Sequence, residues 1–165
     1  MIINGFFQKS LKHKAQIIFE NCLQKKLKIA FGESCTGGLL SVLFTEIPGS
    51  SQVVECGLVT YSNQAKIDFL GVSKKTLERF GAVSKEVAQE MANGLLKNCH
   101  VELAVSVTGI AGPDGGSNEK PVGKVFIAFS SFEKNVIKEF LFVGDRSQVR
   151  FQAVAKALEI IEENL

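Results

Sequence analysis

Apolar segments of two periodicities follow one another along this chain, and their order is the feature that most constrains its fold. Segments with helical spacing and short, continuous apolar runs occur in the order α, β, α, β, α, α, α, β, β, β, α. We expect helices at 6–26, 39–44, 64–70, 73–79, 85–98 and 147–162, and strands at 28–31, 53–62, 103–107, 124–130 and 136–143. Helices interleaved with strands predict an α/β protein, here a three-layer α/β/α domain with a mixed sheet.

Length and composition exclude several classes of protein. A chain of 165 residues has the size of one domain, so we expect a single domain over 1–165. The net charge is only +2, and no basic stripe is interleaved with aromatic residues, which argues against nucleic acid as a partner. No run approaches the roughly 18 apolar residues of a membrane span. We therefore expect neither nucleic acid nor membrane as a partner.

The cysteines and histidines form no recognisable metal or disulfide pattern. His13 lies in a polar helical segment and His100 stands alone, so we expect no metal and no cofactor. There is no Cys-x-x-Cys pair and no secretory signal, which favours a reduced, cytosolic chain. The four cysteines are widely spaced, at Cys22, Cys35, Cys56 and Cys99.

Residues 48–66, PGSSQVVECGLVTYSNQAK, contain a hydroxyl, a phenol and a primary amine within a short span. Ser51, Tyr61 and Lys66 are the smallest set that nucleophilic acyl transfer needs, because an amine of lowered pKa can accept the hydroxyl's proton. With Asn63 as cap, a helix over 64–70 puts Lys66 near the positive end of the helix dipole, which disfavours its charged form. The alternative interpretation is a turn, a strand and a helix cap with no catalytic role.

The segment 32–38, GESCTGG, lies between an expected strand and an expected helix. Unpaired N–H groups at a helix start bind anions, and glycines let a phosphate approach the backbone. The spacing matches neither a Walker loop nor the dinucleotide-binding G-x-G-x-x-G. The alternative is an ordinary helix cap by Ser34 or Thr36.

A long glycine-rich loop, 108–123, joins two apolar strands, and long ordered loops inside compact domains tend to be functional. Open α/β sheets bind ligands at strand ends, so we expect the turns at 32–38, 49–51 and 108–116 to converge. Arg146 and Arg150 lie at the positive start of the last helix, capped by Asp145, an unusual position unless they meet an anion.

Several sequence blocks resemble the C-terminal domain of the competence/damage-inducible CinA family, whose stand-alone members are nicotinamide-nucleotide amidohydrolases. The resemblance runs from about residue 10 to the C-terminus and lacks the family's N-terminal domain, so the chain resembles the stand-alone form. The blocks are AFGESCTGGLLS, TEIPGSS, GLVTYSNQAKIDFLGV, GAVSKEVAQEMANG, AVSVTGIAGPDGG, KPVGKVFIAF and GDRSQVR.

The resemblance implies hydrolysis of nicotinamide mononucleotide to nicotinate mononucleotide and ammonia, an NAD salvage step that needs no metal. The family's catalytic serine, tyrosine and lysine match Ser51 as nucleophile, Tyr61 as proton relay or orienting donor, and Lys66 as the amine that activates the serine. The neighbouring hydroxyl of Ser50 stays open as a participant. The family also suggests a homodimer or a higher homo-oligomer.

The substrate's phosphate and ribose then need binding groups. We expect Arg146 to hold them together with the turn that contains Ser34, Thr36, Gly37 and Gly38. Thr108 is expected near the ribose or the amide. Oxyanion donors would come from backbone N–H groups near 49–51 or in the Thr108–Gly109 turn.

Two rival interpretations stay open at this point. Cys35, a thiol at a helix start, is the alternative nucleophile if its pKa is lowered there. The rival from another class is a non-catalytic nucleotide-binding or regulatory module, which would have no need of a desolvated amine beside a hydroxyl.

Overall fold

A mixed five-stranded sheet forms the middle layer of the molecule, seen in a computed structural model that describes residues 6–165. The strand order is β2-β1-β3-β4-β5. Strand β1 is parallel to β2 and β3, whereas β4 is antiparallel to both β3 and β5. The strands are β1 (Ile29–Glu33), β2 (Val54–Val59), β3 (Leu103–Gly109), β4 (Lys124–Ser131) and β5 (Asn135–Leu141).

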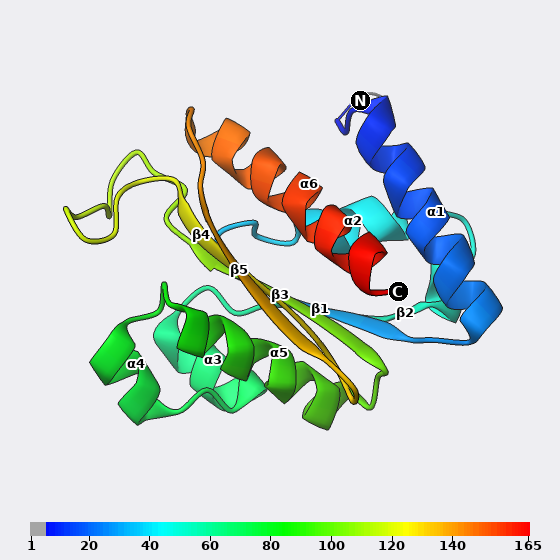
Figure 1. The fold of residues 1–165 in the computed structure, drawn as a ribbon, viewed down its shortest axis with the longest axis horizontal. Coiled ribbons are helices and arrows are strands. Elements are labelled where there is room, and N and C mark those ends of the chain that lie inside the picture. The colour runs from blue at the N-terminus through cyan, green and yellow to red at the C-terminus, as the bar shows by residue number, and fades with distance from the viewer. Residues whose placement is uncertain (1–5) are drawn as a thin grey trace.

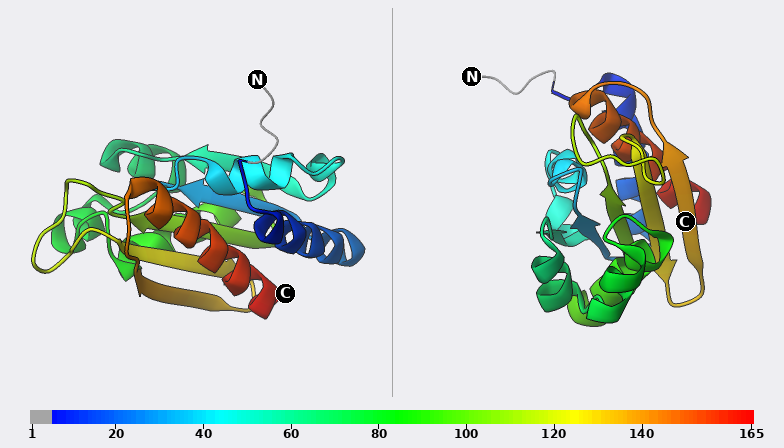
Figure 2. Two further views of the ribbon diagram at one scale, coloured as in Figure 1. Left: turned by 90° about the horizontal axis from the view of Figure 1, so that it is seen from above. Right: turned by 90° about the vertical axis from the view of Figure 1, so that its left-hand side faces the viewer.

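Helices cover both faces of this sheet, as Figures 1 and 2 show. One face carries α1 (Lys9–Lys25), α2 (Leu39–Thr45) and α6 (Arg146–Asn164), which pack against one another. The other face carries α3 (Asn63–Leu70), α4 (Lys74–Phe80) and α5 (Lys85–Cys99). The predicted three-layer α/β/α architecture with a mixed sheet is therefore confirmed; residues 1–5 of the predicted domain lie outside the described residues.

Each helix layer encloses its own apolar cluster, because alternate residues of a strand point to opposite faces. In β1, Phe31 belongs to the cluster under α1, α2 and α6, whereas Ala30 belongs to the cluster under α5. The second cluster depends on a close helix contact at Gly94 of α5. A Cβ there would lie 1.9 Å from the carbonyl oxygen of Leu70, so only glycine lets α5 approach the end of α3.

Element boundaries differ from the predicted ones in small ways that have local causes. Helix α1 begins at Lys9, and β2 ends at Val59. Ser62, not Asn63, caps α3: its Oγ accepts the N–H of Ala65 at 3.0 Å. The predicted cap of α6 by Asp145 is confirmed, and it forms a complete capping box with the residue at the third helical position.

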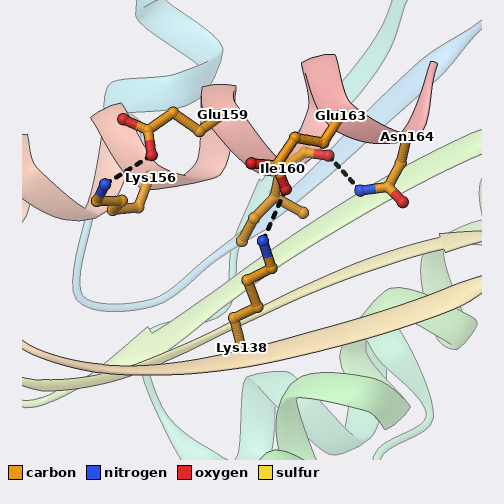
Figure 3. A network of polar contacts seen from close by, with 6 residues as sticks. All are labelled: Lys138, Lys156, Glu159, Ile160, Glu163 and Asn164. Carbon is orange, nitrogen blue, oxygen red and sulfur yellow. Dashed lines mark hydrogen bonds and ion pairs between the residues drawn. The ribbon is translucent and has the colours of Figure 1, made fainter.

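One ion pair attaches the C-terminal end of α6 to β5, and a second lies within α6 (Figure 3). Lys138 Nζ lies 2.7 Å from a carboxylate oxygen of Glu163, and Lys156 lies 2.6 Å from Glu159. The hydrogen bond and the charge of Lys138 lower the pKa of Glu163. Such exposed pairs contribute little to stability, so the buried apolar side of α6 positions the helix.

Within residues 6–165, every helix is too short or too polar to cross a lipid bilayer.

Candidate active site

The carboxyl ends of three adjacent strands, β1, β2 and β3, meet at one edge of the sheet because these strands are parallel. The backbone N–H of Ser34 donates to the carbonyl of Val107 at 2.9 Å, and the N–H of Thr60 donates to the carbonyl of Glu33 at 2.9 Å. The segments that leave the three strands are thus joined directly. The predicted convergence of the turns 32–38 and 108–116 is confirmed.

Ser51 lies at the opposite edge of the sheet, so the third predicted turn does not converge with the other two. Ser50 and Ser51 belong to a 3-10 turn, Ser50–Gln52, that precedes β2, whereas Tyr61 and Lys66 follow it. The Ser51 carbonyl accepts a hydrogen bond from Lys28, the residue before β1. A strand advances about 3.3 Å per residue, so roughly 20 Å separates Ser51 from Lys66 within the chain. The expected Ser51–Tyr61–Lys66 group is not assembled, because β2 separates Ser51 from Tyr61 and Lys66.

Within the described residues, Lys66 is a buried lysine with no carboxylate partner, and its side chain points to the site edge of the sheet. Its residue is only 1% exposed, and Nζ contacts the carbonyls of Thr60 at 2.7 Å and Tyr61 at 3.4 Å. The third contact of Nζ is Ser34 Oγ, at 3.1 Å. Burial lowers the pKa of the Lys66 amine, with a smaller opposing effect from the Cys35 thiol.

Lys66 Nζ donates to three oxygen acceptors, which satisfies the three N–H groups of the charged amine; the neutral amine keeps two N–H donors and has one lone pair. The carbonyls of Thr60 and Tyr61 can only accept, so they take the two N–H groups. Ser34 Oγ accepts from the charged amine at 3.1 Å; in the neutral amine, the lone pair faces this oxygen, and the Ser34 O–H can donate to it. The hydroxyl beside the amine is therefore that of Ser34, not that of Ser51.

Glu33 fixes the turn that carries Ser34. Its carboxylate is fully buried and accepts the N–H groups of Gly38 at 3.0 Å, Leu40 at 3.1 Å and Ser41 at 2.9 Å. It also accepts the Ser41 hydroxyl at 2.7 Å. A protein carboxylate thus occupies the anion-binding start of α2, and sequence reasoning missed it.

The expected phosphate site in this turn is therefore wrong. Gly38 gives its N–H to Glu33, and the Thr36 side chain is fully buried. Gly37 has a φ of 60°, and Arg150 Nη2 contacts the turn through the carbonyl of Thr36 at 2.8 Å. Thr36, Gly37 and Gly38 shape the turn and do not line the pocket; Ser34 alone of the predicted turn residues does.

Arg146 joins the site to the long loop. Its Nη2 donates to Tyr61 Oη at 2.9 Å, and its Nη1 donates to the carbonyl of Gly112 at 2.9 Å. Tyr61 is 61% exposed, so its phenol lies at the mouth of the site, not in its interior. Lys120 holds the same loop from the other side by a hydrogen bond to the carbonyl of Phe80.

Thr108 and Gly109 line the pocket at the end of β3. Thr108 is buried, and its hydroxyl donates to the carbonyl of Ala82 at 2.8 Å. A Cβ at Gly109 would lie 2.8 Å from the carbonyl oxygen of Lys124, so this strand end has no room for a side chain. Contact of Thr108 with ribose or amide stays a prediction.

A pocket of about 260 Å³ collects these groups. The predicted residues that line it are Ser34, Tyr61, Lys66, Thr108, Gly109 and Arg146. Its lining also includes Cys35 and residues that sequence reasoning missed, among them Ala82, Val83, Asp114 and Gly115. A larger hollow of about 430 Å³ lies beside α6, but the one ionisable group among its lining residues is Asp145, which caps that helix.

Cys35 does not have the properties of a thiolate nucleophile. Burial raises the pKa of its thiol to about 12, and the nearby Glu33 acts in the same direction. The start of a helix was expected to lower this pKa. That expectation is wrong because the residue is almost completely buried and Glu33 neutralises the helix start.

Comparison with known proteins agrees with the fold. The sequence model of the CinA C-terminal domain family matches residues 11–165, nearly the whole chain. The chain belongs to the CinA C-terminal domain family. The crystal structure of the competence/damage inducible protein CihA from Agrobacterium tumefaciens is 43% identical, with a TM-score of 0.93 over 95% of this chain and 96% of that one. The crystal structure of a CinA superfamily protein from Escherichia coli is 31% identical, with a TM-score of 0.91 over 100% of this chain and 99% of that one.

Curated relatives of this CinA domain are longer proteins. A putative competence-damage inducible protein from Thermoanaerobacter pseudethanolicus is 45% identical over 150 residues, which are 91% of this chain and 36% of the relative. A CinA-like protein from Syntrophomonas wolfei is 48% identical over 138 residues, 84% of this chain and 33% of the relative. The chain thus spans about a third of the length of these proteins.

Metal ligands are not clustered in the described part of this CinA domain. No group of three or more His, Cys, Asp or Glu side chains lies close enough to hold a metal ion within residues 6–165. The predicted homo-oligomer, the cytoplasmic location and the absence of a cofactor stay predictions.

Proposed function

We propose that this CinA domain is an amidohydrolase that converts nicotinamide mononucleotide to nicotinate mononucleotide and ammonia, with Ser34 as nucleophile and Lys66 as base. The observation that carries the proposal is the contact of 3.1 Å between the buried Lys66 amine and Ser34 Oγ inside a pocket. Burying an amine without a carboxylate partner costs free energy when the amine is charged. Groups with pKa values perturbed in this way are concentrated at functional sites. The family resemblance supplies the particular substrate.

The first half of the reaction acylates Ser34. Lys66 takes the proton of the Ser34 hydroxyl, and Oγ attacks the carboxamide carbon to form a tetrahedral intermediate. The Lys66 ammonium returns that proton to the amide nitrogen, the C–N bond breaks, and ammonia leaves. In the second half, Lys66 removes a proton from water, hydroxide attacks the ester, and Ser34 regains its proton as the nicotinate carboxylate departs.

An oxyanion site is available directly after the nucleophile. Glu33 accepts the N–H groups of Gly38, Leu40 and Ser41, and none from the two residues that follow Ser34. Within the described residues, the backbone N–H of Cys35, which lines the pocket, donates to no backbone carbonyl or carboxylate. A backbone N–H just beyond a nucleophilic serine is a common oxyanion donor. We propose that this N–H group donates a hydrogen bond to the oxyanion of the tetrahedral intermediate.

The charged groups of the pocket suit a pyridine mononucleotide. Arg146 uses two of its five N–H groups on protein acceptors, which leaves donors for the phosphate. Asp114 is a carboxylate in the pocket lining and would attract the positively charged pyridinium ring or bind ribose hydroxyls. Tyr61 Oη, held by Arg146, orients the substrate at the mouth.

The deciding experiment is ammonia release from nicotinamide mononucleotide in the presence of a metal chelator, for the wild type and for Lys66→Ala. Activity that survives chelation and is lost in the variant supports a lysine-assisted hydrolase. If the wild type releases no ammonia but binds the mononucleotide in a calorimeter, the non-catalytic nucleotide-binding module replaces the enzyme.

A further inference from the structure

Two free cysteines outside the active site have their sulfur atoms in contact. Cys56 Sγ lies 3.1 Å from Cys99 Sγ, although 43 positions separate the two residues. Cys56 belongs to the edge strand β2, and Cys99 is the last residue of α5. Both are partly exposed, whereas the other two cysteines, Cys22 and Cys35, are buried.

A β-bulge creates this pairing. Ile29 of β1 faces Val54, but the next residue, Ala30, faces Cys56, so Glu55 is an extra residue in β2. A bulge turns the following side chains to the other face of the sheet. Val54 consequently packs on the cluster under α1, α2 and α6, whereas Cys56 packs on the cluster under α5, where Cys99 lies.

We propose that Cys56 and Cys99 are a reversible disulfide site that cross-links β2 to α5. The sulfurs need to approach by only about 1 Å to reach the length of a disulfide bond. The Cα atoms belong to elements that already pack together through a shared apolar cluster, so the bond requires side-chain adjustment and not a rearrangement of the fold.

The oxidant is a small-molecule disulfide of the glutathione class. The Cys99 thiolate attacks one of its sulfurs, which forms a mixed disulfide and releases one thiolate. Cys56 then attacks the Cys99 sulfur, which forms the protein disulfide and releases the second thiolate. Two protein thiols lose two electrons and two protons, and the small disulfide becomes two thiols.

The raised pKa of the Cys56 thiol makes Cys99 the first sulfur to react. The Cys56 S–H lies within hydrogen-bond distance of the Cys99 sulfur, at 3.1 Å between the sulfur atoms. Burial and this hydrogen bond raise the pKa of Cys56 to about 12, with a further contribution from Glu55. Exchange at this site should therefore be slow at neutral pH and faster as the pH rises.

Cross-linking should stabilise the fold, because the bond closes a long loop that includes α3, α4 and most of α5. Restricting a loop of this length in the unfolded chain raises the melting temperature of a domain of this size by about 5–15 °C. Reduction with dithiothreitol should remove the whole increase.

The test incubates the full chain with glutathione disulfide at pH 8.5, then alkylates it in denaturant and measures intact mass, linked peptides and melting temperature. We expect two alkylated cysteines in place of four, a Cys56–Cys99 peptide, and the increase in melting temperature. Cys99→Ser should show neither the link nor the increase. Cys56→Ser should instead stop at a mixed disulfide on Cys99.

Cys22→Ala is the matched control, since it removes a buried thiol of the other cluster and should keep both the link and the increase. Four alkylated cysteines in the oxidised wild type, or a stable glutathione adduct on its Cys99, would overturn the proposal. A wild-type cross-link that leaves the melting temperature unchanged would overturn the stabilising role.

Discussion

Lys66 Nζ lies 3.1 Å from Ser34 Oγ, although the two residues are 32 positions apart. The contact joins the turn after β1 to the helix after β2, and it exists because these strands are parallel neighbours whose ends are in register at Glu33 and Val59. The sheet thus positions the amine and the hydroxyl, because both follow strands that are packed in the core. That rigidity suits a catalytic pair, which has to be held within a few tenths of an ångström.

Replacement of Ser34 by alanine should abolish amide hydrolysis. Loss of the nucleophile should lower kcat by about a thousandfold or more, while the melting temperature changes little because only one hydroxyl is removed. Ser51→Ala is the matched control and should stay close to wild type, because Ser51 lies at the other edge of the sheet. Ammonia release measured for both variants checks the assignment, and the reverse pattern would return the nucleophile to Ser51.

Activity should rise with pH as Lys66 loses its proton. Its pKa is lowered from the ordinary 10.5, and only the neutral amine accepts the Ser34 proton. The profile of kcat/KM should therefore have an acidic limb with a midpoint below 10.5. Lys66→Arg should be inactive at every pH, since a guanidinium stays protonated. A flat profile together with an active arginine variant would exclude Lys66 as the base.

The same titration should appear in the stability of the fold. Between the lowered pKa and 10.5, the unfolded chain holds more protons at Lys66 than the folded chain does, so the free energy of unfolding rises with pH in that window. The slope is at most about 1.4 kcal/mol per pH unit. Lys66→Met removes the titrating group. Denaturant unfolding at several pH values should show wild-type stability increasing relative to this variant as the pH rises; a constant difference would mean that the amine is charged in the folded protein.

The order of elements could be predicted from the sequence because each depends on local periodicity. The convergence of the turns 32–38 and 108–116 could be predicted too, because they follow β1 and β3, which are adjacent parallel strands. The error at 49–51 arose because that turn precedes its strand, and a turn before a parallel strand lies at the other edge of the sheet.

Other parts of the site could not be predicted because they depend on tertiary contacts. The Ser34–Lys66 pair requires the register between β1 and β2, which periodicity does not determine. Glu33 ends an apolar run and resembles an exposed strand end, but α2 folds back over it and buries the carboxylate. The approach of Asp114 to the pocket depends on the path of a glycine-rich loop, which has no periodicity.

Glu33 should be essential for the shape of the catalytic turn. Glu33→Gln keeps the size but points an amide N–H₂ group at N–H and O–H donors, which leaves buried groups unpaired. We expect a loss of about 2–4 kcal/mol in the free energy of unfolding and a lower kcat, because Ser34 is the next residue. Ser41→Ala, which removes only one donor, should cost about 1 kcal/mol. Urea unfolding and kinetics of both variants check this, and equal effects would show that the carboxylate charge is unimportant.

The hydrogen bond between Arg146 and Tyr61 should act mainly in substrate binding. Arg146→Ala removes the phosphate donors and the link to Gly112, so KM should rise by about tenfold or more, whereas Tyr61→Phe should have a smaller effect. The two groups contact each other at 2.9 Å, so their effects should not add.

A double-mutant cycle on kcat/KM measures this coupling, which we expect to be about 0.5–2 kcal/mol. Lys75→Ala, an exposed cation on α4, controls for the loss of one positive charge and should leave KM unchanged. Additive effects of Tyr61→Phe and Arg146→Ala would mean that the phenol and the guanidinium act on the substrate independently. Coupling that disappears with a substrate lacking the phosphate would instead assign the pair to recognition of the phosphate.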